Sequence, residues 1–224
     1  MKLGVLLPTF RGGVDDAFSL ADEAAASALD GVFAYDHLWP MGSPRRPSLA
    51  PFPLLAAIAR RHNGLIVGPL VARVGLVSTD HLVGEFTTLE RLAPGRVVAA
   101  IGAGDHLSAP ENEAYGLAPQ SADGRRDLMR EAALALAPVM PVWFGAGAPA
   151  TNDVARELGA TLNLWDATVE RVAKEALNGP VNWAGPAPDD LAARLDALAG
   201  AGATWAILTP GASIATLAEW RCTR

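Results

Sequence analysis

The 224-residue sequence contains a single cysteine, Cys222, which excludes an internal disulfide and leaves no Cys-x-x-Cys pair for a zinc site. Its 18 lysines and arginines form no basic cluster and the net charge is −6, so no surface for nucleic acid or an anionic membrane is expected. The apolar start "MKLGVLLPTF" contains Pro8 and ends before Arg11, far short of the roughly 20 residues that span a membrane. These absences favour a cytoplasmic protein, without a membrane partner, that acts on a small molecule.

What the sequence does have is an alternation of short apolar runs with alanine- and leucine-rich helical patterns, as in βα units on a parallel sheet. Strands are expected over residues 3–8, 31–35, 65–71, 97–101, 142–144, 161–164, 181–183 and 205–208. Helices are expected over residues 15–29, 52–61, 83–92, 125–136, 152–158, 169–177, 189–198 and 214–220. Eight strands are the number that closes a barrel. No linker or shift in composition divides the chain, so we expect one α/β domain over residues 1–224 with the (β/α)8 TIM-type fold.

Two stretches, residues 39–51 and 105–124, have no clear periodicity. Both follow the C-terminal end of an expected strand, which is the side on which α/β barrels build their active sites. Loops longer than about 12 residues in a compact domain are more often functional than idle. The functional site is therefore expected at this end of the barrel.

The stretch "GVFAYDHLWP", residues 31–40, begins as a buried strand and ends in polar and aromatic residues. If the strand ends near Tyr35, Asp36 and His37 stand at the barrel mouth, where an imidazole with its ordinary pKa of about 6.5 can donate or accept a proton. Trp39 would wall a cavity there or cover the rim. The alternative is structural: an aspartate that binds local backbone and a histidine that packs nearby.

Two glycine turns follow expected strands at the same end of the barrel, at residues 102–104 (Gly102, Ala103, Gly104) and 145–147 (Gly145, Ala146, Gly147). Glycine lets backbone approach a ring or a phosphate closely, and a helix starting near Thr151 or Asn152 would add its N-terminal amides. The first turn is not the dinucleotide motif G-x-G-x-x-G, because Leu107 stands where the third glycine would be. Ordinary βα turns remain the alternative for both.

The strand expected over residues 65–71 is interrupted by Gly68 and Pro69. Proline in a central strand removes a ladder bond, so a bulge or an early end of the strand is implied. Two further acid–histidine pairs, Asp80–His81 and Asp105–His106, are adjacent residues whose side chains point apart on a strand or helix. Neither pair is by itself a catalytic dyad.

Taken together, these pieces resemble the bacterial luciferase-like monooxygenase superfamily, and in particular its branch of oxidoreductases that depend on the deazaflavin coenzyme F-420. The resemblance runs from Met1 to about Thr209. Its most specific parts are "ALDGVFAYDHL" and "TTLERLAPGRVVAAIGAG". The segments "KLGVLLPTF", "MPVWFGAG" and "AGPAPDDLAARLDALAGAGATWAIL" agree with it but would fit many barrels.

The resemblance implies a TIM-type barrel with F-420, or alternatively FMN, lying across the mouth. It places the family's acid–histidine pair on Asp36 and His37, with the aspartate orienting the histidine, which exchanges a proton with the substrate. It places the bulge behind the cofactor ring near Gly68, Pro69 and Val71, and the phosphate loops on the turns at 102–104 and 145–147. Members of the family also dimerise through early helices, and the alanine-rich "FSLADEAAASAL" would permit such a homodimer.

The chain departs from the family in length, because "ALALAPVMPVWF" runs almost directly from a helix into the fifth strand. An oxidoreductase that transfers a hydride between F-420 and a small organic substrate is expected. The alternatives are an FMN-dependent monooxygenase, a non-catalytic flavin-binding barrel, and a metal-dependent hydrolase using His37, His81 and His106. The last lacks the paired histidines that barrel hydrolases commonly carry at strand one.

Overall fold

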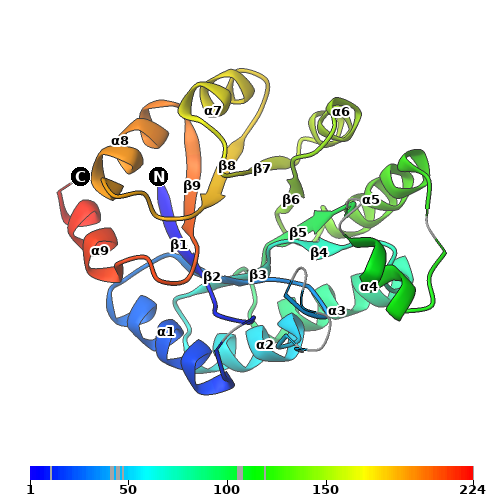
Figure 1. The fold of residues 1–224 in the computed structure, drawn as a ribbon, viewed down its shortest axis with the longest axis horizontal. Helices are drawn as coiled ribbons and strands as arrows, with labels where there is room; N and C mark the ends of the chain where they lie inside the picture. The colour runs from blue at the N-terminus through cyan, green and yellow to red at the C-terminus, as the bar shows by residue number, and fades with distance from the viewer. Residues whose placement is uncertain are drawn as a thin grey trace.

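The computed structural model describes residues 1–10, 12–40, 43, 46, 48–104, 108–118 and 120–223. Strands and helices alternate along this part of the chain (Figure 1). The strands are β1 (Lys2–Leu6), β2 (Gly31–Ala34), β3 (Ile66–Pro69), β4 (Ala72–Arg73), β5 (Ala99–Gly102), β6 (Val142–Gly145), β7 (Thr161–Trp165), β8 (Val181–Gly185) and β9 (Ala203–Leu208). The helices are α1 (Val14–Ala26), α2 (Pro51–Arg61), α3 (Thr79–Leu92), α4 (Ala109–Ala114), α5 (Ala122–Leu136), α6 (Pro149–Glu157), α7 (Val169–Ala176), α8 (Leu191–Gly200) and α9 (Ile214–Cys222).

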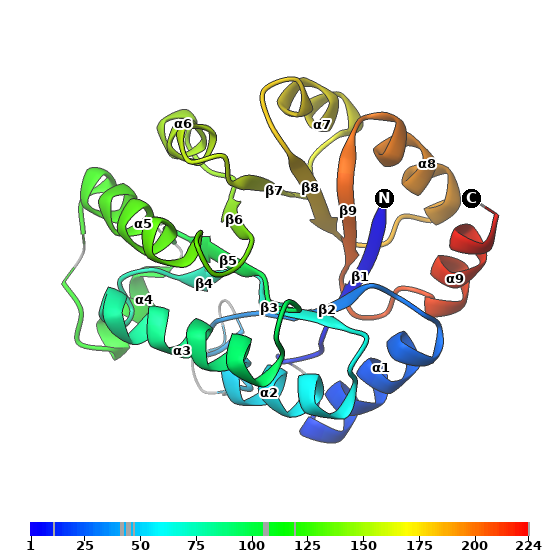
Figure 2. The same ribbon diagram turned by 180° about the vertical axis from the view of Figure 1, so that it is seen from behind.

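The strands form one parallel sheet in the order β3-β2-β1-β9-β8-β7-β6-β5-β4. β3 and β4 share one barrel position, because the chain pairs with β2 as far as Pro69 and with β5 from Ala72. A bridge between Val67 and Val97 joins the two ends of the sheet. The eight positions make a nearly closed barrel with the helices outside it, which confirms the predicted TIM-type fold (Figures 1 and 2).

Side chains on the strands alternate between the barrel interior and the layer beneath the helices. On β2, Val32 packs under the helices whereas Phe33 points into the barrel. Phe33 meets the rings of Trp143 and Trp205 with 5.5 Å between ring centroids in both cases. The interior is therefore a packed core rather than a pore, and its residues are Leu6, Phe33, Leu70, Val98, Ala100, Trp143, Ala184, Trp205 and Ile207.

The interruption expected in the third strand is present. The chain leaves β3 after Pro69, and the peptide bond between Leu70 and Val71 is cis. β4 then resumes the same barrel position at Ala72.

Several helix boundaries differ from the prediction because a capping residue lies outside the apolar pattern. α3 begins at Thr79 rather than at residue 83, since the Oγ of Ser78 accepts a hydrogen bond from the amide of His81 at 3.2 Å. α6 begins at Pro149 rather than at 151 or 152, and proline is favoured at the first helical position because its missing N–H costs nothing there.

The alanine-rich first helix ends at Ala26 rather than at residue 29. Ala17, Ala21 and Ala24 are buried in the layer between helix and barrel, so its small residues serve packing against the strands. Dimerisation through this helix stays a prediction.

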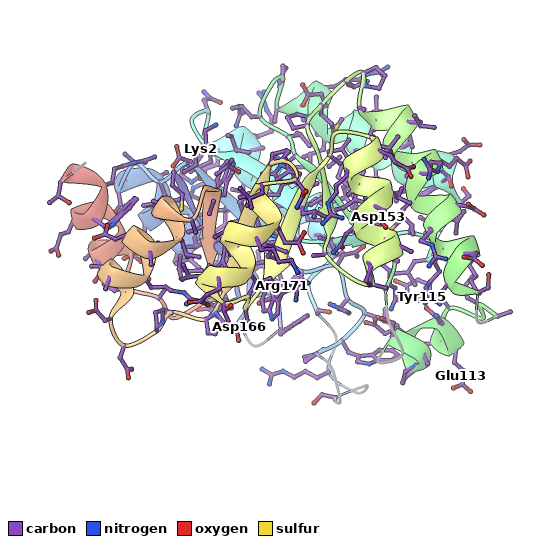
Figure 3. All side chains as sticks on the ribbon, turned by 90° about the horizontal axis from the view of Figure 1, so that it is seen from above. Lys2, Glu113, Tyr115, Asp153, Asp166 and Arg171 are labelled. Carbon is purple, nitrogen blue, oxygen red and sulfur yellow. The ribbon has the colours of Figure 1, made fainter. Side chains whose placement is uncertain are left out.

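α4 lies within the stretch 105–124, where the lack of clear periodicity predicts a loop. No helix within the described part of the chain is long and apolar enough to cross a membrane. Figure 3 places Lys2, at the start of β1, at one end of the barrel, and Asp166, Glu113 and Tyr115 at the other. Asp166 follows β7, so this second end is the mouth formed by the carboxyl ends of the strands.

Candidate functional site

The wall of the mouth is aromatic. Tyr35, the first residue after β2, stacks on Phe10 with 4.6 Å between ring centroids and meets the edge of Trp165 at 6.1 Å. Phe10 also lies 5.8 Å from the ring of His37. Burial raises the pKa of Tyr35 to about 12, so its hydroxyl stays protonated at neutral pH. His37 is thus at the mouth, as predicted, beside rings supplied by the loop after β1 and by β7.

The hydrogen-bond partner of His37 is Glu111, a residue that the sequence analysis did not single out. The Nδ1 of His37 lies 3.0 Å from one carboxylate oxygen of Glu111, and the other oxygen accepts the amide of Leu38 at 2.7 Å. The side chain of Glu111 is only 5% exposed. The buried carboxylate of Glu111 therefore links α4 to the loop after β2.

A buried arginine completes this group. The Nη1 of Arg73, at the end of β4, donates to the oxygen of Glu111 that His37 also contacts, at 2.9 Å. The Nε and Nη2 atoms of Arg73 have no hydrogen-bond partner among the residues that the structure describes. Arg73 also lines a polar cavity of about 30 Å³ next to Gly104 and Arg125. That space is enough for water to satisfy buried donors.

The carboxylate of Asp36 contacts backbone, and its predicted role in orienting His37 stays a prediction. Its Oδ2 accepts the backbone amide of Arg73 at 3.2 Å, and within the described ranges it makes no hydrogen bond to His37. Burial raises the pKa of Asp36, and the Arg73 amide and the charges of His37 and Arg73 oppose that rise. Asp36 joins β2 to β4, and the carboxylate at the Nδ1 of His37 belongs to Glu111.

Three of the predicted glycines are explained by packing. A Cβ on Gly68 would stand 2.5 Å from the carbonyl oxygen of Val98, and one on Gly102 would stand 2.4 Å from a methyl group of Val71. Gly104 has a φ of 66°, and a Cβ there would stand 2.7 Å from the Cδ of Arg73. These glycines let β3, β4 and β5 approach one another.

The second glycine turn is more open. The Oδ1 of Asn152 accepts the amide of Gly147 at 3.0 Å, which fixes the turn at the start of α6. A Cβ on Gly147 would meet nothing nearer than Thr151, at 3.9 Å. Gly145 and Ala146 are half-buried, and Gly145 approaches the half-buried Val71, which would lie 3.4 Å from its Cβ. This part of the mouth has space that the first turn lacks.

Of the three histidines named for a metal site, the structure describes His37 and His81. His81 is exposed on the first turn of α3, where it faces Glu85 at 3.8 Å. His106, with Asp105, lies outside the described residues. Among the residues that are described, no group of three or more His, Cys, Asp or Glu side chains could hold a metal ion.

Comparison with known proteins gives the family. Residues 1–139 match the family model described as luciferase-like monooxygenase. A stretch of 109 residues is 30% identical to the F420-dependent glucose-6-phosphate dehydrogenase of Nakamurella multipartita, covering 48% of this chain and 32% of that one. The match thus spans about a third of the length of this curated relative.

Two solved structures share the fold. An F420-dependent secondary alcohol dehydrogenase, in complex with an F420-acetone adduct, superposes with a TM-score of 0.78 over 93% of this chain and 92% of its own, at 14% identity. The monooxygenase RslO1 from Streptomyces bottropensis gives 0.75 over 99% and 97%, at 16% identity. At these identities the likeness concerns the fold, and the family rests on the match over residues 1–139. The chain belongs to the luciferase-like monooxygenase family.

Proposed function

We propose that this chain is an oxidoreductase that transfers a hydride between coenzyme F-420 and a small organic substrate at the barrel mouth. The observation that carries the proposal is the position of His37, at the carboxyl ends of the strands and with its Nδ1 on a buried carboxylate. A histidine so held presents its second ring nitrogen, Nε2, for proton exchange.

The residues of the mouth fit a planar cofactor that carries a phosphate. The half-buried Val71 offers an apolar surface, and the turn Gly145–Ala146–Gly147 leaves open space near the start of α6. The amides of Ala146 and Gly147 already donate to Asn163 and Asn152, so this turn would contribute space rather than free donors. The amides of Gly102, Ala103 and Gly104 would add to the phosphate contacts. Gly68 and Pro69 would stand behind the ring as parts of the interrupted strand, without a side chain of their own directed to the ligand.

When bound, the deazaflavin would accept or supply the hydride, which is chemistry that the side chains of this protein do not provide. The Nε2 of His37 would take a proton from the substrate oxygen or return it. Phe10, Tyr35 and Trp165 would exclude water from one side of the reacting atoms, since their rings line the mouth beside His37. Asp36 would hold the backbone in place, because its carboxylate, after β2, accepts the amide of Arg73 in β4.

F-420 is preferred to FMN because of the motifs "AYDHLWP" and "AIGAG" and because a relative that is 30% identical is named as F420-dependent. With FMN, the same site would serve a monooxygenase, the activity after which the family is named.

A second candidate function is a barrel that binds a flavin without turnover. It is favoured by one specific observation, the short connection between α5, which ends at Leu136, and β6, which begins at Val142. The two functions differ in whether His37 is needed for turnover or only lies beside the ligand.

Uptake of the cofactor tests the proposal. The purified chain would be mixed with F-420 or FMN at micromolar concentration, separated from free ligand, and examined by its absorbance spectrum, which differs between the two. A bound deazaflavin spectrum supports the proposal, and a bound FMN spectrum supports the monooxygenase alternative. If the chain takes up neither cofactor, the proposed oxidoreductase and the flavin-binding barrel are both wrong.

A further inference from the structure

We propose that Glu111, held by Arg73, is the positioning residue that fixes the side chain of His37 as the Nδ1–H tautomer and leaves Nε2 free to accept a proton at the mouth. The tautomer is a property of the free protein, and only its meaning for turnover rests on the proposed function.

Hydrogen-bond donors surround the carboxylate of Glu111. The amide of Leu38 donates to Oε1 at 2.7 Å, and the guanidinium of Arg73 donates to Oε2 at 2.9 Å. A peptide N–H and a guanidinium can only donate, and an ionised carboxylate can only accept. The third contact of Glu111, to the Nδ1 of His37 at 3.0 Å, is a hydrogen bond only if Nδ1 carries the proton.

The burial of the group makes this choice of tautomer strong. The side chains of Glu111 and Arg73 are 5% and 6% exposed, whereas that of His37 is 26% exposed. Hydrogen bonds to an ionised group are about twice as strong as neutral ones, and water competes little at a buried carboxylate. The exposed part of the imidazole is thus left to solvent or to a ligand.

The other acid next to His37 cannot perform this task in the observed arrangement. Asp36 accepts the backbone amide of Arg73 at 3.2 Å, and burial raises its pKa. The hydroxyl of Ser48 donates to the carbonyl oxygen of His37, so it fixes the backbone and not the ring. The orientation of the imidazole therefore depends on α4, which carries Glu111.

The chain offers a matched control on the same helix. Glu113 is two residues from Glu111 but exposed, and Figure 3 shows it projecting away from the molecule. Glu111→Gln and Glu113→Gln remove the same charge from α4. Only the first disrupts observed hydrogen bonds, because glutamine has one carbonyl oxygen and cannot accept from Leu38, Arg73 and His37 in the geometry of the carboxylate.

The test is long-range ¹H–¹⁵N NMR of the histidine rings in the free protein at pH 9, where an ordinary imidazole is neutral. His37 is assigned by the signal that His37→Ala loses. The wild-type protein and Glu113→Gln should show the Nδ1–H form, and Glu111→Gln should lower its ratio to the Nε2–H form by about tenfold, as expected for a lost hydrogen bond to a charged group. An Nε2–H ring or a doubly protonated ring in the wild-type protein overturns the proposal, as does an unchanged ratio in Glu111→Gln. The wild-type measurement decides even if Glu111→Gln does not fold.

Turnover provides the second measurement. Glu111→Gln should lower turnover by about 10²-fold relative to Glu113→Gln, because the base presents the wrong nitrogen, and it should leave the affinity for F-420 unchanged. Equal turnover of the two variants overturns the positioning role. If the chain binds no cofactor, the proposed function fails, while the tautomer measurement still decides the role of Glu111.

Discussion

The replacement of Gly68 by alanine tests whether this glycine serves packing, as the structure indicates, or is kept open for a ligand. The Cβ of Gly68→Ala would stand 2.5 Å from the carbonyl oxygen of Val98, well inside the roughly 3.5 Å at which such atoms meet without overlap. The obstacle is backbone, which cannot turn aside as a flexible side chain can. The bridge between Val67 and Val97, which joins the ends of the sheet, lies one residue away from this contact on each strand.

The magnitude follows from the cost of overpacking, which is typically about 1–3 kcal/mol. For a chain of this size each kcal/mol shifts Tm by about 2–4 °C, so Gly68→Ala should lower Tm by about 2–12 °C. Gly84 gives the matched control. It lies inside α3 next to the groove between α2 and α3, and beyond its own helix no described atom is within 4 Å of its Cβ position. Gly84→Ala should stabilise by about 0.5–1 kcal/mol, because alanine loses less freedom in a helix.

The assay is thermal unfolding of both variants and the wild-type protein at one pH, followed by far-ultraviolet circular dichroism. The expected result is opposite signs: a lower Tm for Gly68→Ala and a higher Tm for Gly84→Ala. If Gly68→Ala keeps the wild-type Tm and weakens only cofactor binding, the glycine serves the ligand and the close approach of β3 to β5 is wrong.

Two further predictions concern the acid–histidine pair. If the imidazole does acid–base work, His37→Ala should lower turnover by about 10²-fold or more and leave the dissociation constant for F-420 unchanged. Unchanged turnover of this variant in steady-state assays would instead favour a role in binding alone. Because burial raises the pKa of Asp36 in the folded state, the folded form binds the proton more tightly, and stability falls as pH rises from the unfolded value of about 3.9 through the raised folded one. Asp36→Asn removes this loss of stability, and the asparagine side chain can still accept the Arg73 amide. The Tm of this variant should therefore exceed the wild-type Tm at pH 7, and the difference should shrink below pH 4. A lower Tm of the variant at pH 7 would mean that the fold stabilises the ionised form of Asp36.

The barrel could be predicted from the sequence because each strand and helix carries its own local signal. Strands such as β2 and β9 are short buried runs, and α8 buries Leu191, Leu195 and Leu198 at helical spacing. The observed starts of α3 and α6 differ from the predicted ones because Ser78 and Pro149, which favour the start of a helix, lie outside the apolar pattern.

The candidate site was predictable only in part. His37 could be placed at the mouth because it lies three residues after the end of a buried strand. Glu111 could not be paired with it, since 74 residues separate the two and α4, with six residues, is too short to show a helical period. Arg73 lies in an apolar stretch where a buried charge signals a partner, but the sequence does not say which carboxylate that partner is. The sequence also shows where glycines occur but not which neighbouring atom requires each of them.

The central claim is that a deazaflavin binds at the barrel mouth beside His37, and NMR of the histidine side chains during a titration with F-420 tests it most directly. His37 lies at the mouth, whereas His62 follows the C-terminal end of α2 at the opposite end of the barrel, where its ring contacts Asp22. The ring signals of His37 should shift in proportion to bound cofactor while those of His62 stay in place. Binding that leaves His37 unshifted, or no binding at all, would contradict it.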